Sequence, residues 1–274
     1  MTGFIVRPTH EHALIDFGEL WRFRHLFAVL VWRTLKVRYQ QTAIGIAWVV
    51  LQPLLLTFVF TVIFGLLVRL PTDGGQPYPL FVLSGLLVWQ LVAQSFHQAS
   101  GSIVANAHLV TKIYFPRILL LLAAIAAAFV DLLCVLALMF CFMLWYGVPP
   151  GAGGVLAFVP ALLLAAATVL GLSLWLGALY VPYRDVGHLL PFLTQIWMFV
   201  SPVFYPLSLL PSKYELLYAL NPIVVAVQTS RWAFAGGDAP RAGMVAISAA
   251  VAAILLVTGL WYFRRHEGRF ADIV

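Results

Sequence analysis

The stretch ILLLLAAIAAAFVDLLCVLALMFCFMLWY, residues 118–146, is continuous apolar sequence with a single charged side chain, Asp131. A helix needs about 20 predominantly apolar residues to cross the ~30 Å hydrocarbon core of a bilayer, so this stretch is long enough to span a membrane. The rest of the chain has the same character, since 63% of its 274 residues are hydrophobic and only 9% are charged. Soluble domains are about a quarter charged. The sequence therefore predicts an all-α polytopic membrane protein.

Six uncharged stretches of sufficient length follow one another along the chain. We expect transmembrane helices at Ala43–Val68, Pro79–Ser100, Ile118–Tyr146, Val155–Val181, His188–Tyr205 and Ala242–Phe263. These spans divide the chain into an N-terminal segment over 1–42, a six-span transmembrane domain over 43–263, and a C-terminal tail over 264–274.

The basic residues predict the orientation of these spans. With six spans, both termini lie on the same side of the membrane. Of the 16 lysines and arginines, all but Arg69, Lys213, Arg231 and Arg241 fall on that side. Loops rich in lysine and arginine face the cytoplasm. Both termini are therefore expected to be cytoplasmic.

The segment Glu19–Arg38, before the first span, has the pattern of an amphipathic helix. At 100° per residue, one arc collects basic side chains and a neighbouring arc collects apolar ones. The basic arc holds Arg22, His25, Arg33 and Lys36, and the apolar arc holds Phe23, Leu26, Phe27 and Leu30. Such a helix is expected to lie in the cytoplasmic membrane interface. The alternative is a simple topology anchor.

Residues 201–237, between the last two spans, are apolar and aromatic but are cut by four prolines. The pieces between these prolines are too short to cross a bilayer. Broken helices at membrane depth persist when they are buried in protein or line a cavity. We expect a pair of re-entrant helices dipping back from the outer face, with an interfacial loop as the alternative.

The sequence carries no motif for chemistry of its own. It has no G-x-x-x-x-G-K-[ST] loop for nucleotide phosphates, no H-E-x-x-H metal motif and no G-x-S-x-G nucleophile elbow. Cys134 and Cys141 are too far apart on one helix for a disulfide and are interpreted as small core residues. Asp131 is expected to be neutral or paired across a helix interface, because a charge at mid-span costs about 2.5–3.5 kcal/mol. We expect no catalytic residues and no metal site, so energy for any transport must come from outside the chain.

Several motifs in order give the chain a family resemblance. The segments are RYQQTAIGIAWVVLQPL (38–54), LVTKIYFPRI (109–118), YRDVGHLLPFLTQIWMFVSPVFYP (183–206), LYALNPIVVAVQTSRWAFAG (217–236) and RFADIV (269–274). Together they resemble the transmembrane permease subunit of type-2 ABC exporters for cell-surface polysaccharides such as O-antigen, capsule or teichoic acid. The resemblance implies a multi-pass protein of the bacterial inner membrane.

In that family, the cytoplasmic loop between spans two and three carries a coupling helix that docks on a separate ATPase. The resemblance implies that residues 106–117 perform this role. Polar anchoring is expected from Lys112 and Arg117, aromatic contacts from Tyr114 and Phe115, and the bend into the next span from Pro116. The docking set also includes Asn106. The alternative is ordinary membrane flanking by positive-inside residues and interfacial aromatics.

The resemblance also implies the partners and the substrate. Two copies of the chain are expected to form a pore and to pair with two copies of an ABC ATPase, which binds ATP and Mg. The chain itself would need no cofactor and would be a transporter subunit rather than an enzyme. Its substrate would be a glycan on an undecaprenyl-diphosphate-type lipid, moved from the cytoplasm across the inner membrane.

Sugars present apolar C–H faces and many hydroxyls, so aromatic and amide side chains are candidates for the glycan path. The channel-lining candidates are Trp89, Gln90, Gln94, Phe96, Gln195, Trp197, Phe199 and Tyr205. Candidates for the lipid-diphosphate entrance are Arg33, Lys36 and Arg38. Packing and membrane anchoring could explain the aromatics, and topology could explain the three cations.

Other classes of protein remain open at this point. The first alternative is an ABC permease of the same fold that exports a drug or a lipid. A proton- or sodium-driven transporter would need more intramembrane ionisable groups than Asp131. A membrane-embedded glycan ligase would need clustered catalytic groups, which residues 118–181 do not contain.

Overall fold

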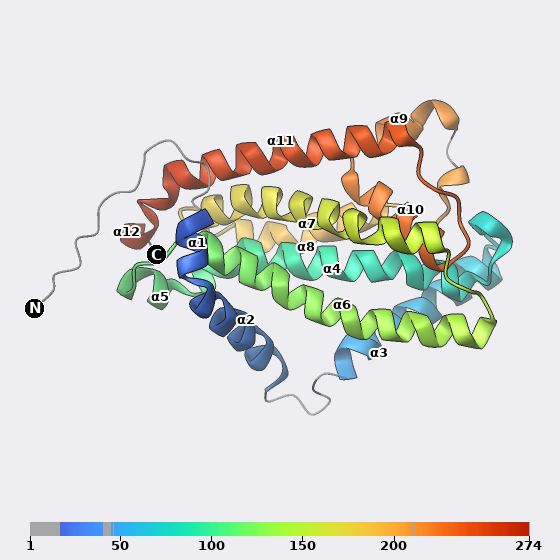
Figure 1. Ribbon diagram of the computed structural model, residues 1–274, viewed down its shortest axis with the longest axis horizontal. Coiled ribbons are helices and arrows are strands. Elements are labelled where there is room, and N and C mark those ends of the chain that lie inside the picture. Colours follow the sequence, from blue (N-terminus) through green and yellow to red (C-terminus); the bar gives the residue numbers. More distant parts are fainter. Residues whose placement is uncertain (1–16, 41–44, 46, 210, 274) are drawn as a thin grey trace, which may run out of the picture.

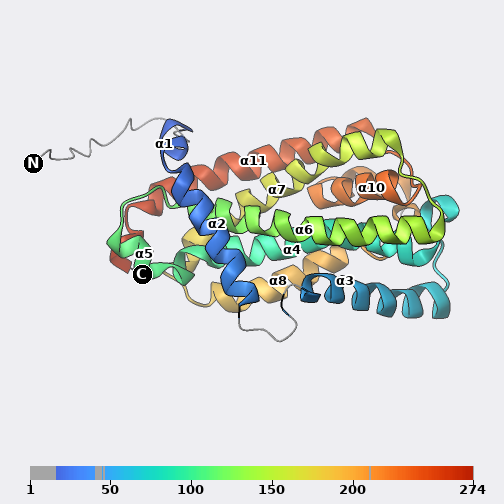
Figure 2. The same ribbon diagram turned by 60° about the horizontal axis from the view of Figure 1, so that its bottom comes forward.

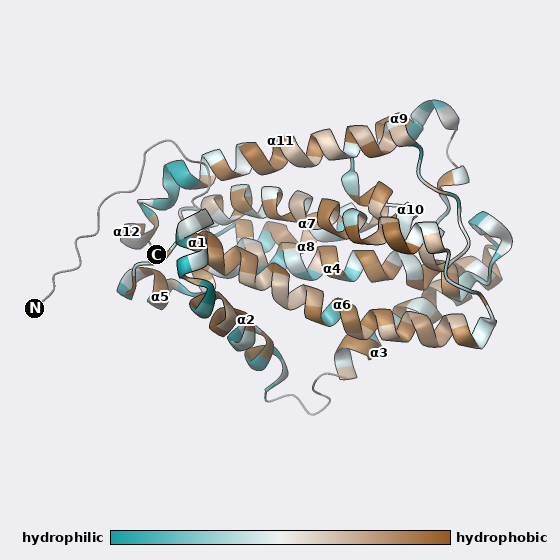
Figure 3. Cartoon of the chain, viewed as in Figure 1, coloured by the Kyte–Doolittle hydropathy of each residue, from teal (hydrophilic) through white to brown (hydrophobic). Residues whose placement is uncertain are grey.

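The computed structural model describes residues 17–40, 45, 47–209 and 211–273. It shows a bundle of long helices that run along one axis, with shorter helices at both ends (Figure 1). No strand occurs in the part of the chain described. Hydrophilic residues are most frequent toward the two ends of the bundle, and hydrophobic residues predominate along the long helices between them (Figure 3). We call the end that carries α1 (Phe17–Arg22), α5 (Ala107–Lys112) and α12 (Phe270–Ile273) the α5 end.

Five helical segments of the described chain are long and apolar enough to cross a membrane. They are α3 (Ala47–Phe60) with the π-helix η1 (Thr61–Leu67), α4 (Tyr78–Ala105), α6 (Ile118–Tyr146), α7 (Ala152–Tyr180) and α11 (Ala242–Glu267). All five overlap predicted spans, and α6 has the predicted bounds. The helical, multi-span class predicted from composition is therefore confirmed.

The predicted fifth span, His188–Tyr205, is represented by the shorter apolar helix α8 (Val186–Val200). At 1.5 Å per residue its 15 residues extend for about 22 Å, which is less than a hydrocarbon core of about 30 Å. The helix ends at Ser201, which has an extended backbone and precedes Pro202. The sixth crossing therefore stays a prediction.

The proline-cut segment after α8 is broken into short helices, as its sequence predicts. These are η3 (Leu207–Leu209), η4 (Ser212–Tyr214), α9 (Glu215–Tyr218) and α10 (Pro222–Phe234). The N-terminus of α10 is capped by Asn221, whose side-chain oxygen accepts from the Ile223 N–H at 3.2 Å. Helix α10 is largely buried and packs against α4, α7 and α11. Re-entry of this segment into the bilayer remains a prediction.

Arg231 was expected on the side of the membrane opposite the termini. In the structure it is a buried residue of α10, with 2% of its surface exposed. Its guanidinium lies 3.7 Å from the centre of the Phe81 ring. It donates hydrogen bonds to the carbonyls of Pro202, Val203 and Tyr205, at 2.5, 3.0 and 3.2 Å. Arg231 thus ties the chain that leaves α8 to the core of the bundle.

The predicted amphipathic helix over Glu19–Arg38 is present as two helices, α1 and α2 (Arg24–Tyr39), separated at Phe23. Helix α2 runs obliquely across the bundle (Figure 2) and packs against α6. Leu30 is its buried residue, while Trp32 and Val37 are exposed. Placement of α2 in the membrane interface stays a prediction.

The interpretation of both cysteines as core residues is wrong for Cys141, which is exposed on α6.

Helices α7 and α11 approach closely because small residues face each other. A Cβ atom added at Gly171 would lie 2.6 Å from the backbone carbon of Leu255, and one added at Gly259 would lie 2.5 Å from the carbonyl oxygen of Gly171. Small residues allow membrane helices to bring their backbones together and gain dispersion contacts.

We expect Gly171→Ala to lower the free energy of unfolding by about 1–3 kcal/mol, because the new methyl group forces two packed backbones apart. Thermal unfolding of the purified protein in detergent measures the effect. The matched control is Gly101→Ala, where the nearest atom, on the Tyr180 ring, would be 3.9 Å away. Equal melting temperatures for the two variants would contradict the close approach.

Candidate functional site

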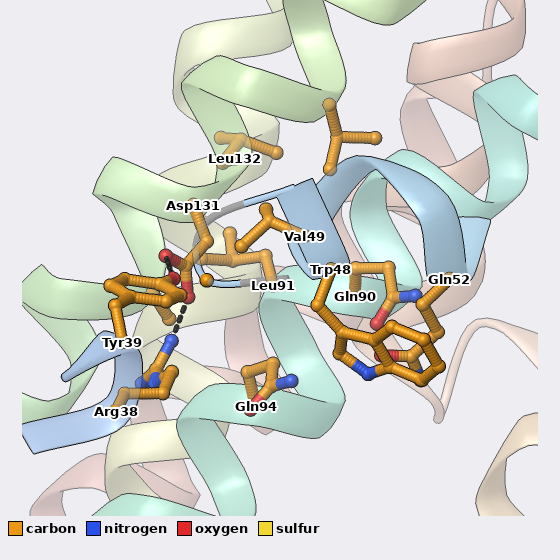
Figure 4. Close-up of a pocket in the computed structure, with 13 residues that line it drawn as sticks. Arg38, Tyr39, Trp48, Val49, Gln52, Gln90, Leu91, Gln94, Asp131 and Leu132 are labelled. Atoms are coloured by element: carbon orange, nitrogen blue, oxygen red, sulfur yellow. Dashed lines mark hydrogen bonds and ion pairs between the residues drawn. The ribbon is translucent and has the colours of Figure 1, made fainter. Parts of the chain in front are cut away.

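The charged residue in the middle of α6 is paired with the end of α2. The guanidinium Nη1 of Arg38 forms an ion pair with the Asp131 carboxylate, and the Tyr39 hydroxyl donates to the other carboxylate oxygen (Figure 4). Nη2 of Arg38 donates to the amide oxygen of Gln98 on α4. Asp131 is therefore paired across a helix interface, which was one of the two states expected for it.

A cavity of about 370 Å³ lies beside this pair, between α3, α4 and α6. Aromatic rings and amides face it, namely Tyr39, Trp48, Gln52, Gln90 and Gln94 (Figure 4). Apolar residues of α4 and α6, including Leu91, Ala128 and Leu132, complete its wall. We call it the deep cavity. Two of the predicted channel-lining residues, Gln90 and Gln94, therefore face one cavity.

A second cavity, of about 490 Å³, lies nearer the α5 end, between α2, α4 and α6. We call it the α5-side cavity. Its polar lining consists of Arg33, Thr34, Arg38, His97, Gln98, Ser102 and Asn106. Arg33 donates from Nη1 to the side-chain oxygen of Asn106 at 3.1 Å. Of the three predicted entrance cations, Arg33 and Arg38 line this cavity, whereas Lys36 is exposed and lines neither cavity.

The segment predicted to dock on a partner lies at the α5 end and is fixed to the rest of the chain. The backbone N–H of Arg117 donates to the Glu267 carboxylate at 3.0 Å, and its guanidinium donates to the Glu267 carbonyl. The same guanidinium lies 6.0 Å from the centre of the Phe270 ring. The start of α6 is thereby joined to the end of α11.

Tyr114 presents most of its side chain to the surrounding medium, with 66% exposed. Its hydroxyl donates to the Glu19 carboxylate of α1 at 3.4 Å. Burial and the neighbouring Glu19 carboxylate raise the pKa of Tyr114 from its ordinary value, so the hydroxyl stays protonated at neutral pH. Lys112 and Ile113 are exposed beside it. Among the residues that the structure describes, this surface of α5 and the following loop is exposed.

The structure places the other docking candidates inside the chain. Phe115 is only 6% exposed and packs in the apolar core near the α5 end. Asn106 is held by Arg33 and donates to the Ser102 carbonyl at 2.8 Å. Pro116 is partly buried at the bend before α6. The expected aromatic contact of Phe115 with a partner is corrected, because its ring packs within its own chain.

The aromatic channel candidates divide into buried and exposed groups. Trp89 and Phe96 are 4% and 2% exposed, and each meets Trp197 edge-on, with ring centres 6.3 and 5.5 Å apart. Trp197 donates from its indole nitrogen to Asn221 at 3.0 Å. These three rings are core packing in the chain described, so Trp89 and Phe96 do not face either cavity.

The remaining candidates lie on or just after α8. Gln195 and Phe199 are exposed on the helix surface. Tyr205 is partly buried and donates from its hydroxyl to the carbonyl of Phe199 at 3.2 Å. The structure thus does not bring the eight predicted channel residues together within one chain.

Sequence reasoning missed Tyr39, Trp48, Gln52, Gln98 and Glu267. A signal for some of them was present, because Gln90, Gln94 and Gln98 repeat every four residues and so share one face of α4. Gln98 donates to Gln94 at 3.1 Å, which confirms that shared face. No such periodicity points to Glu267, which is far from Arg117 in sequence. Among the described residues, no three His, Cys, Asp or Glu side chains cluster to hold a metal ion.

The bundle of long apolar helices, with a partly buried ion pair between α2 and α6, is that of a polytopic membrane protein. The sequence matches the family described as ABC-2 type transporter over residues 25–235, so the chain belongs to this family. It is 30% identical over 258 residues to the O-antigen export system permease protein RfbA of Myxococcus xanthus, covering 93% of this chain and 98% of that protein. It is 26% identical to a protein of the same name from Klebsiella pneumoniae over 249 residues, covering 91% and 95% of the two chains. It is also 24% identical to the polysialic acid transport protein KpsM of Escherichia coli over 239 residues, covering 86% and 91%.

Proposed function

We propose that the chain is the membrane-spanning permease subunit of an ATP-driven exporter that moves a lipid-linked, O-antigen-like polysaccharide from the cytoplasm across the bacterial inner membrane. The observation that carries this proposal is the near full-length similarity to permeases named for O-antigen export and polysialic acid transport. The sequence contains no nucleotide-binding loop, so the energy comes from a separate ABC ATPase that binds ATP and Mg.

In this proposal the α5 end faces the cytoplasm, where the positive-inside rule places both termini. The exposed surface formed by Lys112, Ile113 and Tyr114 meets the ATPase, and Arg117 joins that surface to α11 through Glu267. Phe115 holds the loop in place from within. A rigid connection of this kind suits a loop that must receive force from a partner.

Two copies of the chain, with two ATPase subunits, would enclose the glycan path. In support, α3 with η1 and α8 leave large apolar side chains uncovered, including Leu55, Phe58, Leu66, Phe192 and Ile196. Large exposed apolar faces on helices mark surfaces for lipid or for another protein. Gln195, Phe199 and Tyr205 would then face the path between the copies, and α8 would complete the sixth crossing.

Deleting the gene in its native bacterium is the test of this function. We expect surface polysaccharide to disappear and lipid-linked glycan to accumulate inside the cell, with both effects reversed by the intact chain supplied on a plasmid. An ATPase with a nucleotide-binding loop should co-purify with the tagged protein. Unchanged surface polysaccharide together with altered sensitivity to drugs would instead identify an exporter of drugs or lipids.

A further inference from the structure

The deep cavity and the α5-side cavity are neighbours, since Arg38 lines both of them. On α6, the α5-side cavity touches Leu120 and Ala124, and the deep cavity touches Ala128, Asp131 and Val135. Helix α4 runs in the opposite direction to α6. Its residues between His97 and Asn106 line the α5-side cavity, and those between Gln90 and Gln94 line the deep cavity, so both helices place the two cavities in the same order along the bundle. Arg38, paired with Asp131 (Figure 4), lines both cavities.

The α5-side cavity has the chemistry of an anion site. Arg33 and Arg38 line it together with His97, and neutral donors come from Gln98 and Asn106. Asp131 balances the charge of Arg38, so the unbalanced positive charge of this cavity comes from Arg33. No carboxylate is among its described lining residues. Guanidinium groups bind phosphate oxygens through charge-assisted hydrogen bonds. The bonds of Arg38 to Asp131 and Gln98 leave further N–H groups of the five that a guanidinium carries.

The deep cavity has a different, uncharged character. The charge of Arg38 is balanced there by Asp131, and the remaining polar groups are neutral: the Tyr39 hydroxyl and the amides of Gln52, Gln90 and Gln94. Trp48 supplies a broad aromatic surface. The volume of the deep cavity, about 370 Å³, lies within the usual range of small-molecule sites. A sugar matches this lining, because it has apolar C–H faces for a ring and hydroxyls for amides.

We propose that the two cavities together hold the lipid-proximal end of the substrate, with the diphosphate in the α5-side cavity and the first sugar in the deep cavity. This inference rests on the proposed export of a lipid-linked glycan. Arg33 and Arg38 bind the diphosphate, and Trp48 with Gln90 binds the sugar. Each copy of the chain therefore carries its own site, located within the copy and not between copies.

Binding of two short-chain lipids to the full-length protein in nanodiscs tests the assignment. The probes are farnesyl diphosphate and the same lipid diphosphate carrying one N-acetylglucosamine. We expect Arg33→Gln to weaken both probes about tenfold or more, because each loses a charge-assisted hydrogen bond. We expect Trp48→Ala to weaken only the sugar-bearing probe, also about tenfold, and Trp48→Phe to retain most of its affinity. Inorganic pyrophosphate should bind more weakly than either lipid, and equal binding would identify a free-diphosphate site instead.

Two matched variants on α2 serve as controls. Lys36→Gln removes the same charge as Arg33→Gln, and Trp32→Ala removes the same ring as Trp48→Ala, but neither residue lines a cavity. Equal weakening by Lys36→Gln and Arg33→Gln would overturn the diphosphate assignment, since surface charge alone would then explain binding. A Trp48→Ala variant that melts normally and binds the sugar-bearing probe like the unaltered protein would overturn the sugar assignment.

The site and the proposed function fail in different ways. If deleting the gene abolishes surface polysaccharide but the cavity variants bind both probes normally, only the site is wrong. If the unaltered protein binds neither probe, the site is also overturned, while the export function is judged by the polysaccharide at the cell surface.

Discussion

Asp131→Ala is expected to lower the free energy of unfolding by about 1–3 kcal/mol, because it leaves the partly buried guanidinium of Arg38 without its counter-ion. The carboxylate also accepts the Tyr39 hydroxyl, which would lose its partner in the same step. Thermal or denaturant unfolding of the purified protein in detergent measures the change. The expected loss of stability is substantial because the pair lies between helices, far from either end of α6.

The double variant Arg38→Met with Asp131→Leu provides the decisive comparison. Replacing a buried ion pair by apolar residues of similar size is often neutral or stabilising, so the double variant should recover most of the lost stability. Asp185→Ala, which removes an exposed acid, should change stability by less than about 0.5 kcal/mol. A double variant as unstable as Asp131→Ala would mean that the two charges do not stabilise each other.

Replacing Tyr114 and Arg117 together by alanine is expected to reduce export at least about tenfold while the protein stays in the membrane. Tyr114 is the exposed aromatic of the loop, and Arg117 connects the loop to Glu267 at the end of α11. Without both groups the partner would lose a contact and the loop would lose its rigid support. Surface polysaccharide, protein in the membrane fraction and ATP hydrolysis by the purified complex are the three measurements, with hydrolysis expected to continue.

A matched pair of substitutions at the opposite end of the bundle controls for loss of a tyrosine and an arginine. Tyr146 and Arg69 are both exposed there, and their replacement by alanine should leave export close to normal. Undiminished export by the Tyr114 and Arg117 double variant would exclude this loop as the point where force enters the chain.

The sequence was sufficient to predict the long helices, because uninterrupted apolar length is a local property. The bounds of α6 follow from Arg117 on one side and Gly147 on the other, where a left-handed C-cap ends the helix. Helix α8 was predicted too long, since apolar composition continues past Val200 while the extended backbone at Ser201 and the following proline end the helix.

The candidate site was only partly predictable, since its members are distant in sequence. An acid in the middle of an apolar span suggested a partner, but nothing local indicates that this partner of Asp131 is Arg38, which lies on a helix before the first span. Composition also does not tell which face of a helix is covered. Trp89 and Gln90 are adjacent on α4, yet the ring is buried against Trp197 and the amide faces the deep cavity.

The ion pair between Arg38 and Asp131 links α2 to the middle of α6. Asp131 lies roughly 20 Å along α6 from its first turn, at 1.5 Å per residue. The same helix begins at the loop that Arg117 fastens to α11. If a partner tilts α6 at this loop, as the proposed docking requires, the ion pair would carry the end of α2 with it. Under the proposed function, force received at the α5 end would then reach the segment that leads into the first span.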